Sequence, residues 1–239
     1  MRAAFKLLSA ILHLLHGYWI IKTQFSRISQ EKREQHVRVW SSQLIAKLGL
    51  QLHVSGVPVK HGMIVANHIS WLDILAIHAA HFCRFIAKSD IKAWPVIGYL
   101  TAGSGTLFVE RSSRRDAHRV VDTVAKRLLE GDCVALFPEG TTGEGRELLP
   151  FHANMIQSAI DAGAVIQPVS IQFIDTIKGT QSFAPCYVGD ESLLQSVWRT
   201  LNAKGIVVKL QFGEPQSANY RDRRAWAKDL HATIHTMLT

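Results

Sequence analysis

A histidine and an aspartate stand five positions apart directly after a short apolar run. Residues 63–65 have the composition of a buried strand, and "ANHISWLDI" follows at residues 66–74 with His68 and Asp73. A neutral imidazole accepts a proton at cellular pH, and a neighbouring carboxylate can fix its tautomer and stabilise the imidazolium. The pair could therefore turn a hydroxyl group into a nucleophile.

The same residues have a structural interpretation, and this stretch alone leaves both open. Positions five apart on a regular helix are rotated by about 140°, so His68 can meet Asp73 only from a turn before the helix. Residues 70–73 have the S-x-x-D spacing of a variant capping box, with Ser70 as the N-cap. Such a start places His68 outside the helix but also gives Asp73 an ordinary capping role.

Two further polar clusters follow apolar runs. "GTLFVER" ends at Arg111, which could hold a phosphate through two hydrogen bonds or could be a plain surface arginine. In "FPEGTT", Gly140 permits a tight turn and Thr141 supplies a hydroxyl, while Glu139 could bind a substrate hydroxyl or pair with Arg111. Neither a G-x-S-x-G turn nor a cysteine beside a base occurs in the sequence, so a covalent acyl-enzyme is not indicated.

Short apolar runs alternate with helical stretches from residue 51 onward, and these elements must position the clusters. We predict strands at Met63–Ala66, Arg84–Ala87, Thr106–Glu110, Cys133–Phe137, Val165–Phe173 and Ile206–Phe212. We predict helices at 71–80, 114–130, 151–162, 191–202 and 221–236. Strands that are apolar throughout indicate an α/β domain with a mixed, mostly parallel sheet covered by helices. Ligands of such sheets gather at the carboxyl ends of the strands.

The first 50 residues are predicted to form a membrane-associating helical segment ahead of the domain at 51–239. The apolar core, Leu7–Ile21, would span roughly 22 Å as a helix, which is short of a ~30 Å hydrocarbon layer. Polar residues 2, 6, 9, 13 and 16 draw one stripe along it, which favours an amphipathic helix at the membrane interface. A single span, a signal peptide and a core helix are the alternatives. Residues 28–48 read as a second amphipathic helix that packs on the domain or contacts the membrane.

The composition limits the classes of partner. The 239-residue chain has a net charge of +8 and 47% hydrophobic residues, which suits an enzyme with an anionic partner and a membrane-associated part. Nucleic acid is disfavoured, because only the basic pI and the arginines of 111–119 support it. The cysteines 83, 133 and 186 lack any metal-binding spacing and are expected to be buried free thiols.

The order of the motifs resembles the lysophosphatidic acid acyltransferase (PlsC-like) family of glycerolipid acyltransferases. The matching pieces are NH-x4-D, G-x-L-F-V-x-R, F-P-E-G-T and a strand with Pro168, and they cover about residues 63–173. The resemblance implies that His68 is the general base and Asp73 its orienting partner. It implies that Arg111 holds the acceptor phosphate and that Glu139, Gly140 and Thr141 help to bind the acceptor.

The resemblance also implies substrates and a location. The enzyme would transfer an acyl group from acyl-CoA or acyl-carrier protein to the hydroxyl of 1-acyl-sn-glycerol-3-phosphate, giving phosphatidic acid without a cofactor or metal. Other acceptors, such as lyso-ornithine lipid or another lysophospholipid, are the alternative, and a non-catalytic anionic-lipid-binding protein is a further one. The family implies the cytoplasmic face of the bacterial inner membrane, peripheral or shallowly inserted. One departure is Thr142, where many members carry an arginine; the next basic residue is Arg146.

Overall fold

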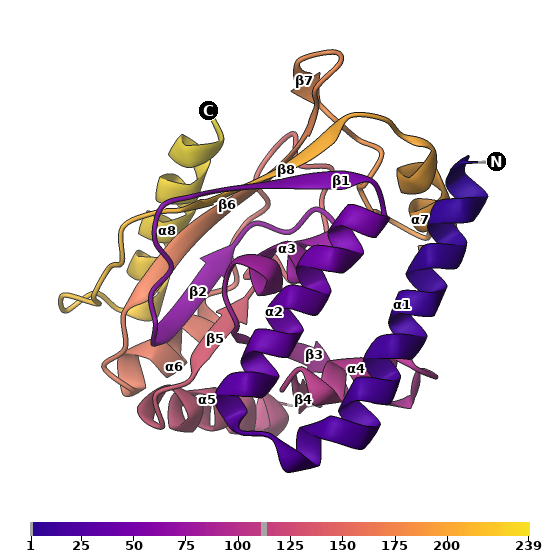
Figure 1. Ribbon diagram of the computed structural model, residues 1–239. Coiled ribbons are helices and arrows are strands. Elements are labelled where there is room, and N and C mark those ends of the chain that lie inside the picture. Colours follow the sequence, from indigo (N-terminus) through magenta and orange to yellow (C-terminus); the bar gives the residue numbers. More distant parts are fainter. Residues whose placement is uncertain (1, 111–113) are drawn as a thin grey trace.

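A single mixed sheet organises the molecule, with helices on both of its faces (Figure 1). The computed structural model describes residues 2–110 and 114–239. Within them the sheet has eight strands, seven of them in the order β1-β8-β6-β2-β5-β3-β4, while β7 pairs with β6. The strands are β1 (Leu50–Ser55), β2 (Gly62–Ala66), β3 (Arg84–Lys88), β4 (Leu107–Val109), β5 (Cys133–Leu136), β6 (Ile166–Asp175), β7 (Thr180–Gln181) and β8 (Ile206–Phe212).

The central strands are parallel, as their continuous apolar sequences predict. β2 pairs in parallel with β5 on one side and β6 on the other, and β3 pairs in parallel with both β5 and β4. β8 runs antiparallel to β6, and β1 is parallel to β8. The predicted mixed, mostly parallel α/β sheet is therefore confirmed.

Alternation along β2 divides the core in two. Ile64 and Ala66 join the cluster under one set of helices, whereas Met63 and Val65 join the cluster on the other face. The first face is covered by α1 (Arg2–Gln24), α2 (Gln30–Lys47), α3 (Leu72–Ala80) and α7 (Leu193–Asn202). The second is covered by α5 (Arg114–Leu129), α6 (Ile156–Asp161) and α8 (Arg223–Leu238). The short α4 (Ile97–Gly103) contacts α1.

The N-terminal helix α1 turns part of its predicted polar stripe inward. His13 is buried, donates from Nε2 to the Trp40 carbonyl over 3.0 Å, and receives the Trp40 indole N–H at its own carbonyl over 3.1 Å. Gly17 makes this approach possible, because a Cβ there would lie 2.5 Å from Trp40 Nε1. Burial lowers the pKa of His13, so burial disfavours a positive charge on this part of the predicted polar stripe.

The side of α1 opposite His13 and Gly17 is apolar and exposed. This outer stripe consists of Phe5, Leu8, Ile11, Leu12, Leu15 and Trp19. The segment Arg2–Arg27, which includes a 3₁₀ turn at Phe25–Arg27, is long and apolar enough by length and composition to cross a membrane. α2, by contrast, packs on the domain through α3 and buries Val37 and Leu44.

The elements that the sequence did not predict have weak local patterns. β1 lies at a sheet edge, and most of its side chains are exposed or half-buried, so it lacks an apolar run. α4 follows Pro95 and contains Gly98 and Gly103, which argue against a helix in a sequence-based prediction. β7 is only two residues long and forms by pairing with β6.

Candidate active site

Two of the motif clusters meet because β2 and β5 are parallel neighbours in register. Val65 is opposite Leu136, so residues three positions further on, His68 and Glu139, leave the same edge of the sheet together. The Glu139 carboxylate accepts the His68 backbone N–H over 2.6 Å. The carboxyl edge of the sheet therefore brings the first and third motifs into direct contact.

His68 and Asp73 face each other as the catalytic hypothesis requires. His68 Nδ1 lies 2.8 Å from Asp73 Oδ2, and the Asp73 side chain is fully buried while that of His68 is 19% exposed. Because a carboxylate only accepts, the proton on this hydrogen bond belongs to Nδ1, and Nε2 carries the free lone pair. Nε2 is thus the ring nitrogen that can take a proton from a substrate.

The turn before α3 makes this geometry possible. Asp73 Oδ2 also accepts the backbone N–H groups of Ile69 and Ser70, over 2.6 and 2.8 Å. These bonds curl the chain back, so His68 lies in a turn although it is five positions from Asp73. α3 begins at Leu72 with Trp71 at the cap, one residue later than predicted. The Ser70 hydroxyl nevertheless accepts the Leu72 N–H over 3.3 Å, and it donates to the Pro185 carbonyl over 2.6 Å.

His68 is held both at its ring and at its backbone. Its ring stacks on Phe137, with ring centroids 3.9 Å apart and planes 6° from parallel. Its backbone carbonyl accepts the Gly143 N–H over 2.8 Å, and its backbone N–H is bound by Glu139. The imidazole consequently has one orientation set by packing as well as by Asp73.

Glu139 occupies a buried position, and both of its oxygens have backbone partners. Oε1 accepts the His68 N–H, and Oε2 accepts the Leu149 N–H over 3.0 Å. Burial raises the pKa of Glu139, and the two backbone hydrogen bonds act in the opposite direction. The substrate contact predicted for Glu139 would have to compete with these two amides.

Of the other predicted site residues, the structure describes Gly140 and Thr141 but not Arg111. Arg111 lies outside the described residues, so its predicted phosphate contact stays a prediction. Gly140 has φ 72° and is exposed, and a Cβ there would lie 3.2 Å from His152 Cδ2. Thr141 is exposed beside it. Thr142, at the position where the resemblance leads one to expect arginine, donates its hydroxyl to the Tyr187 carbonyl.

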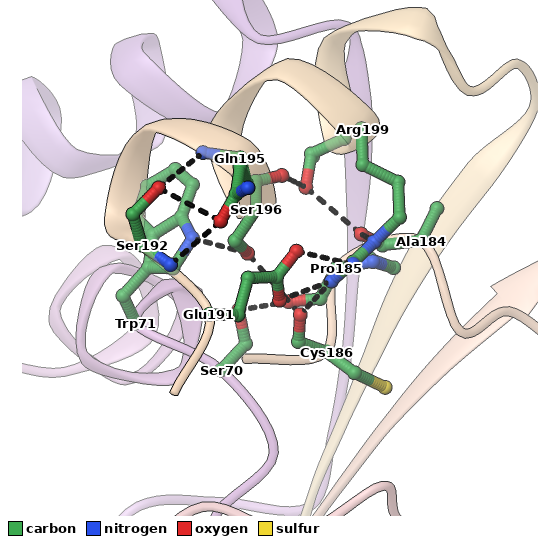
Figure 2. A network of polar contacts seen from close by, with 11 residues as sticks. Ser70, Trp71, Ala184, Pro185, Cys186, Glu191, Ser192, Gln195, Ser196 and Arg199 are labelled. Carbon is green, nitrogen blue, oxygen red and sulfur yellow. Dashed lines mark hydrogen bonds and ion pairs between the residues drawn. The ribbon is translucent and has the colours of Figure 1, made fainter. Parts of the chain in front are cut away.

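A remote segment, residues 184–187, forms one wall of the turn that holds His68. The Tyr187 N–H donates to the Ile69 carbonyl over 3.1 Å, so this segment binds both the first and the third motif. Figure 2 shows how α7 fixes it: Arg199 donates from Nε to the Ala184 carbonyl over 2.9 Å and from a terminal nitrogen to the Cys186 carbonyl. Sequence reasoning missed this segment because nothing local marks it as a partner of residues more than a hundred positions away.

Asn67 is a second residue that sequence reasoning passed over. Its side-chain oxygen accepts the Ile171 N–H over 2.7 Å, and its amide nitrogen donates to the Ile171 carbonyl over 3.0 Å. The Asn67 side chain therefore continues the hydrogen bonding between β2 and β6 beyond the last residue of β2. The position of Asn67 directly before His68 in the NH-x4-D motif is the sequence feature that could have marked it as a site residue.

The three cysteines are buried free thiols, as predicted. Burial raises the pKa of Cys133 to about 12 and that of Cys186 to about 11, and it raises the pKa of Cys83 well above its usual value. These side chains are neutral thiols at cellular pH and are poor nucleophiles.

An open α/β sheet with a paired histidine and aspartate at its carboxyl edge defines an enzyme that can activate a hydroxyl group. Comparisons with known proteins identify the family to which this enzyme belongs. A family profile described as "Acyltransferase" matches residues 51–172. The chain therefore belongs to the acyltransferase family.

Individual relatives have two kinds of acceptor in their names. A 1-acyl-sn-glycerol-3-phosphate acyltransferase of Neisseria gonorrhoeae is 36% identical over 198 residues, which cover 81% of this chain and 77% of the relative. A lyso-ornithine lipid O-acyltransferase of Pseudomonas aeruginosa is 35% identical over 208 residues, covering 86% and 79%. The crystal structure of the 1-acyl-sn-glycerophosphate acyltransferase PlsC from Thermotoga maritima shares the fold, with a TM-score of 0.71, 18% identity and coverage of 98% and 96%.

Proposed function

We propose that the protein transfers a fatty acyl group from a thioester to the free hydroxyl of a lysolipid, with His68 as general base. The observation that carries the proposal is the 2.8 Å bond between His68 Nδ1 and the buried Asp73 carboxylate, which leaves Nε2 free. Membership of the acyltransferase family supplies the reaction class.

In this proposal the reaction uses only His68, Asp73 and the two substrates. Nε2 of His68 takes the hydroxyl proton while the hydroxyl oxygen forms a bond to the thioester carbonyl carbon. Asp73 stabilises the imidazolium that results, because its negative charge lies at the opposite ring nitrogen. The tetrahedral intermediate then collapses, the carbon–sulfur bond breaks, and the imidazolium returns the proton to the departing thiolate. The products are the acylated lipid and the free thiol of coenzyme A or acyl-carrier protein.

The other polar groups around His68 have positioning or binding roles in this proposal. Glu139 positions the backbone of His68, since both of its oxygens hold amide groups. Gly140 and Thr141 lie exposed at the same edge, where an acceptor could reach them, and Arg111 is the proposed phosphate ligand.

The proposed acceptor is 1-acyl-sn-glycerol-3-phosphate, and the product is phosphatidic acid. Lyso-ornithine lipid is the second candidate, because relatives with each of these substrates in their names have nearly the same identity to this chain, 36% and 35%. The two acceptors differ in charge: the first carries a phosphate, which suits a basic enzyme with net charge +8.

We further propose that residues 1–50 attach the catalytic domain, 51–239, to the cytoplasmic face of a bacterial inner membrane. The N-terminal apolar helix and the membrane-lipid acyltransferases among the relatives both suggest membrane association. The physical support is the orientation of α1, whose outer stripe is exposed while His13 and Gly17 face the protein. Such a helix has its apolar side where lipid would be.

A direct test offers purified protein in liposomes a choice of acceptors. Thiol release from palmitoyl-CoA and from palmitoyl-acyl-carrier protein is followed with 1-acyl-sn-glycerol-3-phosphate, lyso-ornithine lipid or no acceptor, and the products are identified by mass spectrometry. We expect acceptor-dependent release with a preference for the phosphate-bearing lysolipid. A preference for lyso-ornithine lipid would move the substrate to the second candidate. Binding of lipid without any thiol release from folded protein would instead leave a non-catalytic lipid-binding protein.

A further inference from the structure

Helix α7 carries two large apolar side chains that face away from the protein. Leu194 and Trp198 are 77% and 50% exposed and lie one turn apart on the same side of the helix. The opposite side buries Ser196 and Thr200 against the domain. The capping box at Ser192 fixes where the helix begins, so the exposed side belongs to a well-defined element.

The turn between β6 and β7 adds a third exposed apolar residue close to α7. Ile177, at the tip of this turn, is 73% exposed. The Thr176 N–H donates to the Gly205 carbonyl over 2.7 Å, which places the turn beside the chain that leaves α7. An open cleft of about 1070 Å³ separates the turn from α7, and its lining includes Lys178 and Lys204. We call Leu194, Trp198 and Ile177 the α7 ridge.

The α7 ridge is a neighbour of α1. The two helices are in contact, and Lys6 donates from Nζ to the Leu201 carbonyl over 3.4 Å. Figure 1 shows α7 beside the N-terminal end of α1. The N-terminal part of the outer stripe, Phe5 and Leu8, is the part closest in sequence to this contact.

We propose that the α7 ridge is a second lipid contact, which rests on an anionic bilayer together with the outer stripe of α1. The inference rests on the membrane association proposed above. A tryptophan next to exposed aliphatic side chains is typical of the membrane–water interface. Lys178 and Lys204 line the cleft together with two arginines and three carboxylates, and this small excess of positive charge attracts anionic head groups. Two contacts on different elements fix the tilt of the domain on the membrane, which one helix alone does not do.

The consequence for the enzyme follows from the hydrogen bonds of α7. The helix that carries Leu194 and Trp198 also holds the 184–187 segment through Arg199, and that segment binds the turn containing His68. The surface that meets lipid is thus only one element away from the candidate catalytic pair. A lysolipid acceptor could leave the bilayer beside the site that uses it.

Vesicle partitioning of matched variants tests the proposal. Wild type, Leu194→Ser/Trp198→Ser, Leu8→Ser/Leu12→Ser and the control Leu129→Ser are co-sedimented with vesicles of phosphatidylcholine and phosphatidylglycerol. Leu129 is 70% exposed at the end of α5, on the other face of the sheet. We expect the α7 variant to lose binding on the order of tenfold, because two apolar side chains no longer leave water, and the control to bind as wild type does.

The α1 variant separates failure of this inference from failure of the membrane proposal. If the α1 variant loses binding and the α7 variant binds as wild type does, the α7 ridge is not a lipid contact, although α1 is one. If both variants bind as wild type does, membrane attachment through α1 fails and the inference fails with it. Thermal unfolding of each variant shows that the fold is retained.

Trp198 provides a second readout that does not depend on weakened binding. Vesicles with brominated acyl chains quench tryptophans that reach the hydrocarbon, and Trp198→Phe retains an apolar side chain at this position. We expect a smaller quenched fraction of the emission in the variant than in wild type at equal bound protein. An equal quenched fraction would overturn the proposal.

In the co-sedimentation assay, Lys178→Gln/Lys204→Gln should weaken binding to anionic vesicles more than to pure phosphatidylcholine vesicles, and equal effects on both would overturn the head-group contact.

Discussion

The candidate site depends on a few residues whose atoms are already in place. Asp73 does two tasks with one oxygen: it binds His68 Nδ1 and it holds the turn through the Ile69 and Ser70 amides. The catalytic and capping interpretations of Asp73, which the sequence left open, are therefore compatible in the structure. Substitution of Asp73 separates their contributions to turnover.

Asp73→Asn should keep the turn and remove the charge. An asparagine oxygen can still accept the two backbone amides, but it cannot stabilise an imidazolium at His68. We expect kcat to fall on the order of 10²- to 10⁴-fold with the melting temperature little changed. Steady-state kinetics and thermal unfolding measure both, with Asp122→Asn, an exposed aspartate of α5, as control. A loss of activity that merely follows a loss of fold would make Asp73 a capping residue only.

Glu139→Gln should lower both stability and kcat. The amide nitrogen of glutamine cannot accept, so one of the two backbone N–H groups, of His68 or Leu149, loses its partner in a buried place. We expect the free energy of unfolding to fall by about 1–3 kcal/mol, and kcat to fall because His68 shifts. Direct binding of the acceptor by Glu139 would give a different pattern: a raised Michaelis constant with unchanged stability.

At the scale of elements, the site is assembled by strand register and by a segment that no local pattern marks. The apolar runs predicted β2 and β5 and placed the polar clusters at strand ends, but the contact between His68 and Glu139 follows from the parallel register of the two strands, which the sequence did not predict. The positions of β1, α4 and residues 184–187 could not be predicted in this way. Their places follow from pairing with β8, from packing against α1 and from the hydrogen bonds of Arg199, all of which join parts far apart in sequence.

Arg199→Ala should show that α7 supports the site. The variant removes the donors to the Ala184 and Cys186 carbonyls, whereas the ion pair with Glu191 is partly exposed and contributes little. We expect a loss of about 1–2 kcal/mol in stability and a lower kcat, with Arg199→Lys intermediate. Kinetics and thermal unfolding are compared with Arg224→Ala, an exposed arginine of α8. Unchanged kcat in Arg199→Ala would separate α7 from the site.

At the scale of the molecule, the sheet separates two cores and α1 adds an apolar surface outside both. The α/β architecture was predictable because the central strands are apolar throughout and alternate with helices. The orientation of α1 was not, since a polar stripe on an apolar helix can face water or protein. The contact between His13 and Trp40 turns this part of the polar stripe toward the protein, and the outer stripe is exposed.

Thiol chemistry reports on the integrity of the whole fold. Raised pKa values mean that thiolates form only as the pH rises far above neutrality, about 12 for Cys133 and about 11 for Cys186. We expect Ellman's reagent at pH 8 to react very slowly with the native protein and to titrate three thiols after denaturation. Rapid reaction of any thiol in native protein at pH 8 would contradict the burial of these residues.

The most direct test of the central claim is acceptor-dependent thiol release by wild type and His68→Ala, measured side by side in liposomes. The matched control is His61→Ala, because His61 lies at the amino end of β2, at the opposite edge of the sheet. His68 as general base predicts that wild type and His61→Ala turn over while His68→Ala, folded and bound to vesicles, releases no thiol above background. Turnover by folded His68→Ala within a few-fold of wild type would contradict it.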